Sequence, residues 1–132
     1  MTLILVLIVT GYYISQTTHV RNPDNQLKTS TSVSTHIRVS QTISTESQGK
    51  KKEETMIISR GSTALDLLKK ISKVQMKGEG ANAFITSING RAADDIKKEF
   101  WAFYINGKQA EVGAGSYVLK DNDKIEWKLE TY

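Results

Sequence analysis

Cysteine is absent from the 132 residues, and proline occurs once, at Pro23. The lack of cysteine excludes disulfides, thiolate metal sites, a cysteine nucleophile and a lipid-modified N-terminal cysteine. Histidine is scarce as well, because His19 and His36 are the only two, and neither has a carboxylate or cysteine neighbour at ligand spacing. We therefore expect no metal site, and a core that is stable through packing alone.

Neither sign of charge dominates the chain. Lys and Arg number 18 against 14 Asp and Glu, which gives a formal net charge of +4. Basic residues are mostly interleaved with acidic ones, as in Lys50-Lys51-Lys52-Glu53-Glu54, whereas a nucleic-acid footprint needs basic residues clustered on one face. The composition thus predicts no nucleic-acid partner and a mildly basic surface that suits an anionic envelope.

Catalytic motifs are also missing from the sequence. No glycine-rich phosphate loop occurs, and no Ser, His and Asp stand in a recognisable nucleophile context. The acidic pairs Asp94-Asp95 and Asp121/Asp123 resemble fragments of a calcium loop, but the spacing with a following bidentate Glu is absent. We expect solvated turns there, and a protein that is not an enzyme and requires no cofactor.

The first residues form an apolar run, from Leu3 to Ile14. Its length is that of a signal-peptide core, and at about 1.5 Å per residue it falls short of a ~30 Å membrane. Residues 1–14 are therefore predicted to be a signal peptide or short membrane anchor, although no Lys or Arg precedes the run; a buried N-terminal strand is the alternative. The polar residues 15–31 are predicted to be a flexible linker.

This arrangement predicts a protein that is secreted or anchored at the outer face of the cell membrane. In that case only the N-terminal segment contacts the membrane. The remaining residues, 32–132, have the length of one domain, which we expect to be a monomer.

Period-two alternation begins at Ser32 and continues to Ile43, which predicts a strand with one buried face. A second strand is predicted over 54–59, joined to the first by a polar loop containing Gly49, as in a hairpin. Further strands are predicted over 83–88, 100–105, 108–112 and 125–129. Asn89-Gly90 and Asn106-Gly107 are strong tight-turn dipeptides between them.

One helix is predicted, from Thr63 to about Lys73. Ala64, Leu65, Leu68 and Ile71 recur at helical spacing. Asp66 follows Thr63 by three positions, the spacing of a capping box. One helix among several strands predicts an α+β class and a β-grasp-like two-layer fold, with one mixed sheet packed on a single helix.

Three segments then carry a family resemblance: GSTALDLLKKI, AFITSINGRAAD and FWAFYINGKQAEVGAGSYVLKDNDKIEWKLETY. Together, over residues 33–132, they resemble the domain of unknown function in surface proteins of Gram-positive bacteria that is similar to the C-terminal domain of transcobalamin and intrinsic factor. The most specific elements are Phe100-Trp101 leading into Tyr104-Ile105-Asn106-Gly107, the Gly-Ser-Tyr bend at 115–117, and Ile125-Glu126-Trp127.

The resemblance implies a small domain that, in the vertebrate carriers, covers one face of cobalamin. A separate α/α barrel forms the opposite wall of the site in those proteins. The sequence contains no segment that resembles such a barrel. The resemblance therefore favours an exported or cell-surface ligand-binding module, with cobalamin or another corrinoid as its ligand. The alternative is a structural or adhesive surface domain that binds a protein or a cell-wall polymer.

The aromatic strand over 100–105 supplies the central site candidates. Trp101 and Phe103 lie on one face, and Phe100 and Tyr104 on the other. If Trp101 packs under the helix, Phe100 and Tyr104 remain on the open face, where they could stack a flat ligand. The candidate ligand-binding residues are Phe84, Asn89, Phe100, Trp101, Tyr104, Asn106 and Tyr117. The alternative is that the aromatic residues are structural on both faces and that the two asparagines only form turns.

Overall fold

The computed structural model describes residues 32–45 and 51–132, and its secondary structure lies within a compact unit, Val33–Tyr132. The predicted signal segment and linker, residues 1–31, lie outside the described residues. No described helix has both the length and the apolar character needed to cross a membrane. The elements in chain order are β1 (His36–Ser44), β2 (Lys52–Ser59), α1 (Ala64–Ile71), β3 (Val74–Lys77), the 3₁₀ turn η1 (Gly80–Asn82), β4 (Phe84–Ile88), β5 (Arg91–Ala92), β6 (Glu99–Ile105), β7 (Lys108–Gln109) and β8 (Lys124–Thr131).

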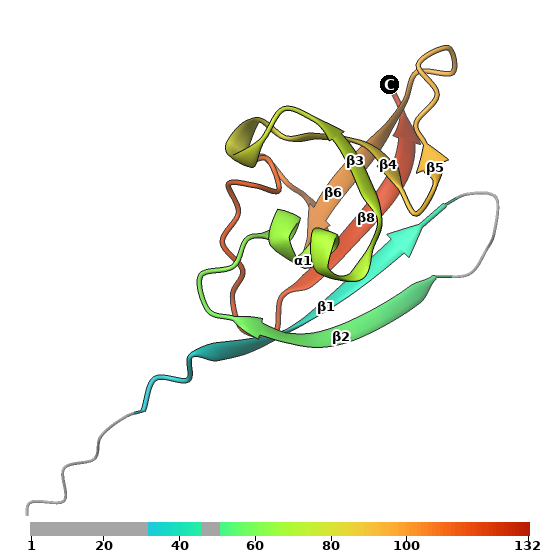
Figure 1. Ribbon diagram of the computed structural model, residues 1–132. Helices are drawn as coiled ribbons and strands as arrows, with labels where there is room; N and C mark the ends of the chain where they lie inside the picture. Colours follow the sequence, from blue (N-terminus) through green and yellow to red (C-terminus); the bar gives the residue numbers. More distant parts are fainter. Residues whose placement is uncertain (1–31, 46–50) are drawn as a thin grey trace, which may run out of the picture. The chain divides into compact units, whose positions relative to one another are not determined.

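The main sheet has five strands in the order β2-β1-β8-β6-β7. It is mixed, because β1 runs parallel to β8 while the other neighbouring pairs are antiparallel. The first and last strands of the domain therefore lie side by side in the middle of the sheet, as the cyan and red arrows of Figure 1 show. The predicted mixed sheet and hairpin are confirmed.

One face of the main sheet, which we call the inner face, carries the hydrophobic core. The alternation predicted for β1 places Ile37 and Val39 on this face, and both are buried. Trp101 and Phe103 of β6 pair with Leu129 and Trp127 of β8 on the same face. The alternate residues of these strands lie on the opposite, outer face, and all of them except Ala102 are at least partly exposed.

Helix α1 begins where its predicted capping box places it. Thr63 Oγ1 accepts a hydrogen bond from the Asp66 amide at 3.2 Å, and the Asp66 carboxylate accepts one from the Thr63 amide at 2.8 Å. The helix ends at Ile71, before the predicted Lys73, because Ser72 is already extended and β3 follows at Val74. The buried leucines of the helix join the core on the inner face.

The prediction of a single sheet was wrong. A second, three-stranded sheet has the order β3-β4-β5, and β3 lies where no strand was expected. Its four residues are too few to show a period, and the register with β4 shifts between Gln75 and Met76. Ile85 and Ile88 of β4 enter the hydrophobic core. Both α1 and the second sheet therefore lie over the inner face (Figure 1).

Candidate functional site

The face that Trp101 occupies decides which aromatic residues a ligand can reach. Trp101 is 5% exposed on the inner face, and its indole Nε1 donates to the carbonyl of Arg91 at 3.2 Å. Phe100 and Tyr104 lie on the outer face and are half-buried. Trp101 thus packs in the core, and Phe100 and Tyr104 remain on the opposite face, as the alternation along β6 predicted.

Phe100 and Tyr104 belong to what we call the outer-face cluster, together with Lys128, Glu130 and Tyr132. The Tyr104 hydroxyl donates to Glu130 Oε1 at 2.7 Å, and the Lys128 ammonium lies 4.0 Å from the centre of the Tyr104 ring. The Phe100 and Tyr132 rings are 6.1 Å apart, centre to centre. The cluster therefore offers two aromatic surfaces beside a cation and an anion, on one exposed side of the sheet.

The charged groups in and beside the outer-face cluster are paired with one another. The hydrogen bond to Glu130 raises the pKa of Tyr104 above its ordinary value. Burial acts to raise the pKa of neighbouring Glu126, but hydrogen bonds from Lys128 and Lys51 outweigh it, and the pKa lies below its ordinary value. The Nζ atoms of Lys51 and Lys128 each lie 3.3 Å from a carboxylate oxygen of Glu126. Stacking and hydrogen bonding are thus the chemistry available here.

Asn106 and Tyr117 both donate hydrogen bonds to Asp123, a residue that the sequence predicted to lie in a solvated turn. Asp123 is 4% exposed, and its carboxylate accepts from Asn106 Nδ2 at 2.9 Å, from the Tyr117 hydroxyl at 2.9 Å and from the Lys120 amide at 2.8 Å. Burial, followed by the hydrogen bond to Asp123, raises the pKa of Tyr117 to about 12. Both candidates therefore hold the fold together through this carboxylate.

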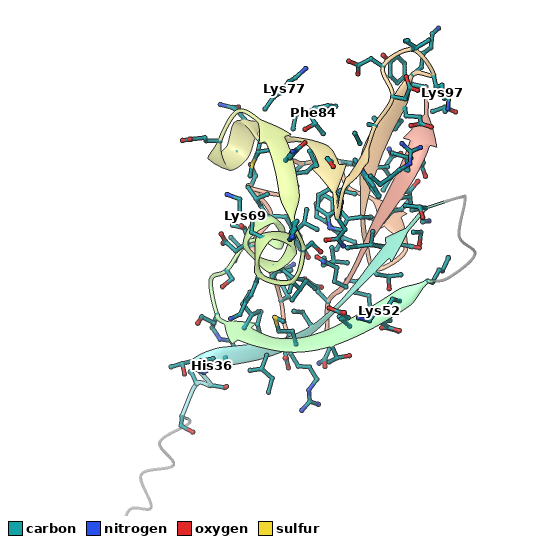
Figure 2. All side chains as sticks on the ribbon, turned by 45° about the vertical axis from the view of Figure 1, so that its right-hand side comes forward. His36, Lys52, Lys69, Lys77, Phe84 and Lys97 are labelled. Carbon is teal, nitrogen blue, oxygen red and sulfur yellow. The ribbon has the colours of Figure 1, made fainter. Side chains whose placement is uncertain are left out.

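Asn89 and Phe84 lie on the second sheet or its turn. Asn89 has φ of +49°, its Oδ1 accepts from the Lys73 amide at 2.9 Å, and it ties the β4–β5 turn to the end of the helix. Phe84 is 55% exposed and pairs across the strands with Lys77 (Figure 2). The seven candidate residues thus do not form one site, and their role in ligand binding stays a prediction.

A pocket that the sequence did not predict opens at one end of the core. Its volume is about 390 Å³, and its walls come from β1, β2, the end of α1, and the β4–β5 turn. Gln41 lines it and is 2% exposed. The one feature of the sequence that could have indicated this pocket is Gln41 itself. It is a polar residue at an inward position of β1, between Val39 and Ile43.

Acidic side chains near the turns accept hydrogen bonds from backbone amides. Asp121 accepts from the Arg38 amide at 2.8 Å, and Asp94 accepts from the Ile96 amide at 2.9 Å. Within residues 32–45 and 51–132, no three His, Cys, Asp or Glu side chains are grouped as metal ligands.

Solved structures share this fold, among them the following two. Haptocorrin in complex with Cbi superposes with a TM-score of 0.62 at 21% identity over 74% of this chain, which spans only 25% of haptocorrin. A protein from Ruminococcus gnavus ATCC 29149, described as a candidate metal-binding protein, superposes with a TM-score of 0.59 at 21% identity over 73% of this chain and 98% of its own. No curated protein matches in sequence.

A family model matches residues 61–131, which run from the turn before α1 to the end of β8. This range includes the helix, the second sheet and the aromatic strand, the segments on which the resemblance of the sequence rested. The chain therefore belongs to the family described as Domain of unknown function (DUF4430).

Proposed function

We propose that this protein is an exported or cell-surface module that binds a ligand without catalysing a reaction, and that the ligand is cobalamin or another corrinoid. The observation that carries the proposal is the outer-face cluster, where Phe100 and Tyr104 remain accessible on the sheet face opposite the core. Accessible aromatic rings beside polar groups are typical of surfaces that bind a flat, partly apolar ligand.

The fold likeness supports the same choice of ligand class. Haptocorrin, which shares the fold, was crystallised with Cbi, a corrinoid. A sheet face is one wall and not a closed cavity, so tight binding of a large ligand needs a second wall. We propose that a separate chain supplies it, in a clamp of two parts. We also infer that the fold is β-grasp-like, which the parallel β1–β8 pair and the helix over the inner face support.

Titration with cobalamin and cobinamide tests the proposal. Corrinoids absorb visible light, so binding changes their own spectrum, a better signal than the fluorescence of Trp101 and Trp127, which both lie in the core. We expect a saturable spectral change that weakens by about tenfold or more in Tyr104→Ala and Phe100→Ala, because each removes a stacking surface worth ~1.4 kcal/mol or more. Val112→Ala, an exposed apolar change in the segment after β7, is the matched control.

Two outcomes would contradict this assignment. If Phe84→Ala weakened binding while the outer-face variants did not, the site would lie on the second sheet. If no spectral change occurred at high micromolar corrinoid, the ligand class would be wrong.

A structural or adhesive role is the second candidate, and one observation favours it. In the part of the chain that the structure describes, β2 pairs only with β1, so its other edge is free, and Ile57 on this strand is 61% exposed. Free strand edges recruit peptide strands from partners. Adhesion to surface protein or cell-wall polymer that Ile57→Lys abolishes, without any corrinoid response, would support this role instead.

A further inference from the structure

The pocket at the end of the core has the size of a small-molecule site, with a lining that is mostly polar. Its volume of about 390 Å³ falls within the ~300–1,000 Å³ typical of ligand pockets. Ile43 of β1, Ile71 of α1 and Ile88 of β4 form apolar walls. It lies on the inner side of the sheet, since Gln41 and Ile43 point away from the face that holds the outer-face cluster.

Gln41 gives this pocket an unused hydrogen-bonding group. The residue is 2% exposed, and neither its amide nitrogen nor its carbonyl oxygen has a partner among the described residues. The buried hydroxyl of Ser72, which also lines the pocket, is likewise without a partner there. Buried polar groups are nearly always hydrogen-bonded, because leaving them unpaired costs the full desolvation of the group. These atoms therefore leave donors and acceptors in the pocket that a bound molecule can pair with.

The charges around the pocket are paired with one another. Lys52, labelled in Figure 2, forms an ion pair with Glu54, its neighbour but one on β2. Arg91 donates to both carboxylate oxygens of Glu99 at 2.9 Å. With both cations paired, the described lining of the pocket has no free cation to hold an anion, so a neutral ligand fits its electrostatics.

We propose that this pocket binds a small neutral molecule that carries a carboxamide or lactam group. A primary amide such as that of Gln41 presents one acceptor and two donors, and a cis-amide edge offers the complementary donor and acceptor in one plane. Such a ligand satisfies both atoms of Gln41 with two parallel hydrogen bonds, and its apolar part packs against the three isoleucines. Ser72 supplies a third polar contact.

This site is separate from the proposed corrinoid surface. It lies on the other side of the sheet and uses none of the outer-face cluster. Variants of Tyr104 and Phe100 therefore leave it intact, so the two proposals fail independently.

The test uses 2-pyrrolidone and nicotinamide as probes, followed by two-dimensional NMR of the whole chain. We expect saturable shifts of the Gln41 side-chain amide and of the Ser72 and Ile88 signals. In Gln41→Leu the dissociation constant should rise by about tenfold or more. Because leucine is apolar and of similar size, this variant should fold with undiminished stability. Thr42→Val is the matched control, since Thr42 is the next residue of β1 and faces the other side.

Three results would overturn the proposal. The first is the absence of saturable shifts with either probe. The second is equal binding by Gln41→Leu and the native protein. The third is a high-resolution crystal structure, grown with the probe, in which ordered waters alone satisfy Gln41 and the probe is absent. Water is the ordinary occupant of a polar cavity, so this last result would assign the pocket to hydration.

Discussion

Tyr117 donates its hydroxyl hydrogen to the buried carboxylate of Asp123 at 2.9 Å. Its ring packs edge-on against Phe103, with the ring centres 6.2 Å apart. Tyr117 thus connects the irregular segment before β8 with the core. Asp123 in turn joins this segment to the β6–β7 turn through Asn106. The residue that resembled a stacking group in the sequence is therefore a structural connection.

Removing the Tyr117 hydroxyl should destabilise the protein without unfolding it. In Tyr117→Phe the ring contact remains, but one oxygen of a buried carboxylate loses a donor. We expect the free energy of unfolding to fall by about 1–3 kcal/mol. Urea denaturation measures this change, with Tyr132→Phe as the control, because Tyr132 is exposed. Equal stability of the two variants would show that the bond to Asp123 contributes nothing.

The same hydroxyl should make stability depend on alkaline pH. The pKa of Tyr117 rises from 10.0 to about 12 in the folded protein, so the folded state holds this proton more tightly than the unfolded state. Its contribution is complete below pH 10 and is lost as the pH rises toward 12. The stability difference between native protein and Tyr117→Phe should therefore shrink over that interval. Denaturation midpoints at a series of pH values measure it; a constant difference would contradict the assignment.

The capping box at the start of α1 gives a third prediction. Thr63→Ala removes the hydroxyl that accepts from the Asp66 amide. We expect a loss of about 0.5–2 kcal/mol in the free energy of unfolding. Ser62→Ala is the adjacent control, since the contact that Ser62 makes to Leu119 uses its backbone carbonyl. If both substitutions had the same effect in thermal denaturation, capping would not be the cause.

Gly115 gives a fourth prediction, because backbone segments pass close to each other there. A Cβ atom at this position would lie 1.9 Å from the carbonyl oxygen of Gly80. Gly115→Ala must therefore push the segment after β7 away from η1. We expect the free energy of unfolding to fall by about 1–3 kcal/mol. The exposed neighbour Ser116 provides the control as Ser116→Ala, which should be nearly neutral. An unchanged melting temperature in Gly115→Ala would show that the approach is not tight.

Local patterns were enough to predict part of this fold. The alternation in β1 and the capping box at Thr63 involve residues a few positions apart, so their structural signals are complete within the sequence. The second sheet was missed because β3 is short and depends on its pairing with β4. The outer-face position of Tyr104 followed once Trp101 was assigned to the core. Nothing local indicated the burial of Asp123. For the pocket the only local signal was Gln41 at an inward position of β1, because the other walls come from segments distant in the chain.

The parallel pairing of β1 with β8 has a consequence for biosynthesis. Ser40 lies opposite Lys124, so the centre of the sheet cannot form until nearly the whole domain has left the ribosome. Until then the apolar side of the β1–β2 hairpin has no permanent cover. Such long-range closure slows folding and prolongs exposure to aggregation. A nascent chain of this kind exposes apolar surface for longer than one whose neighbours in sequence are neighbours in space.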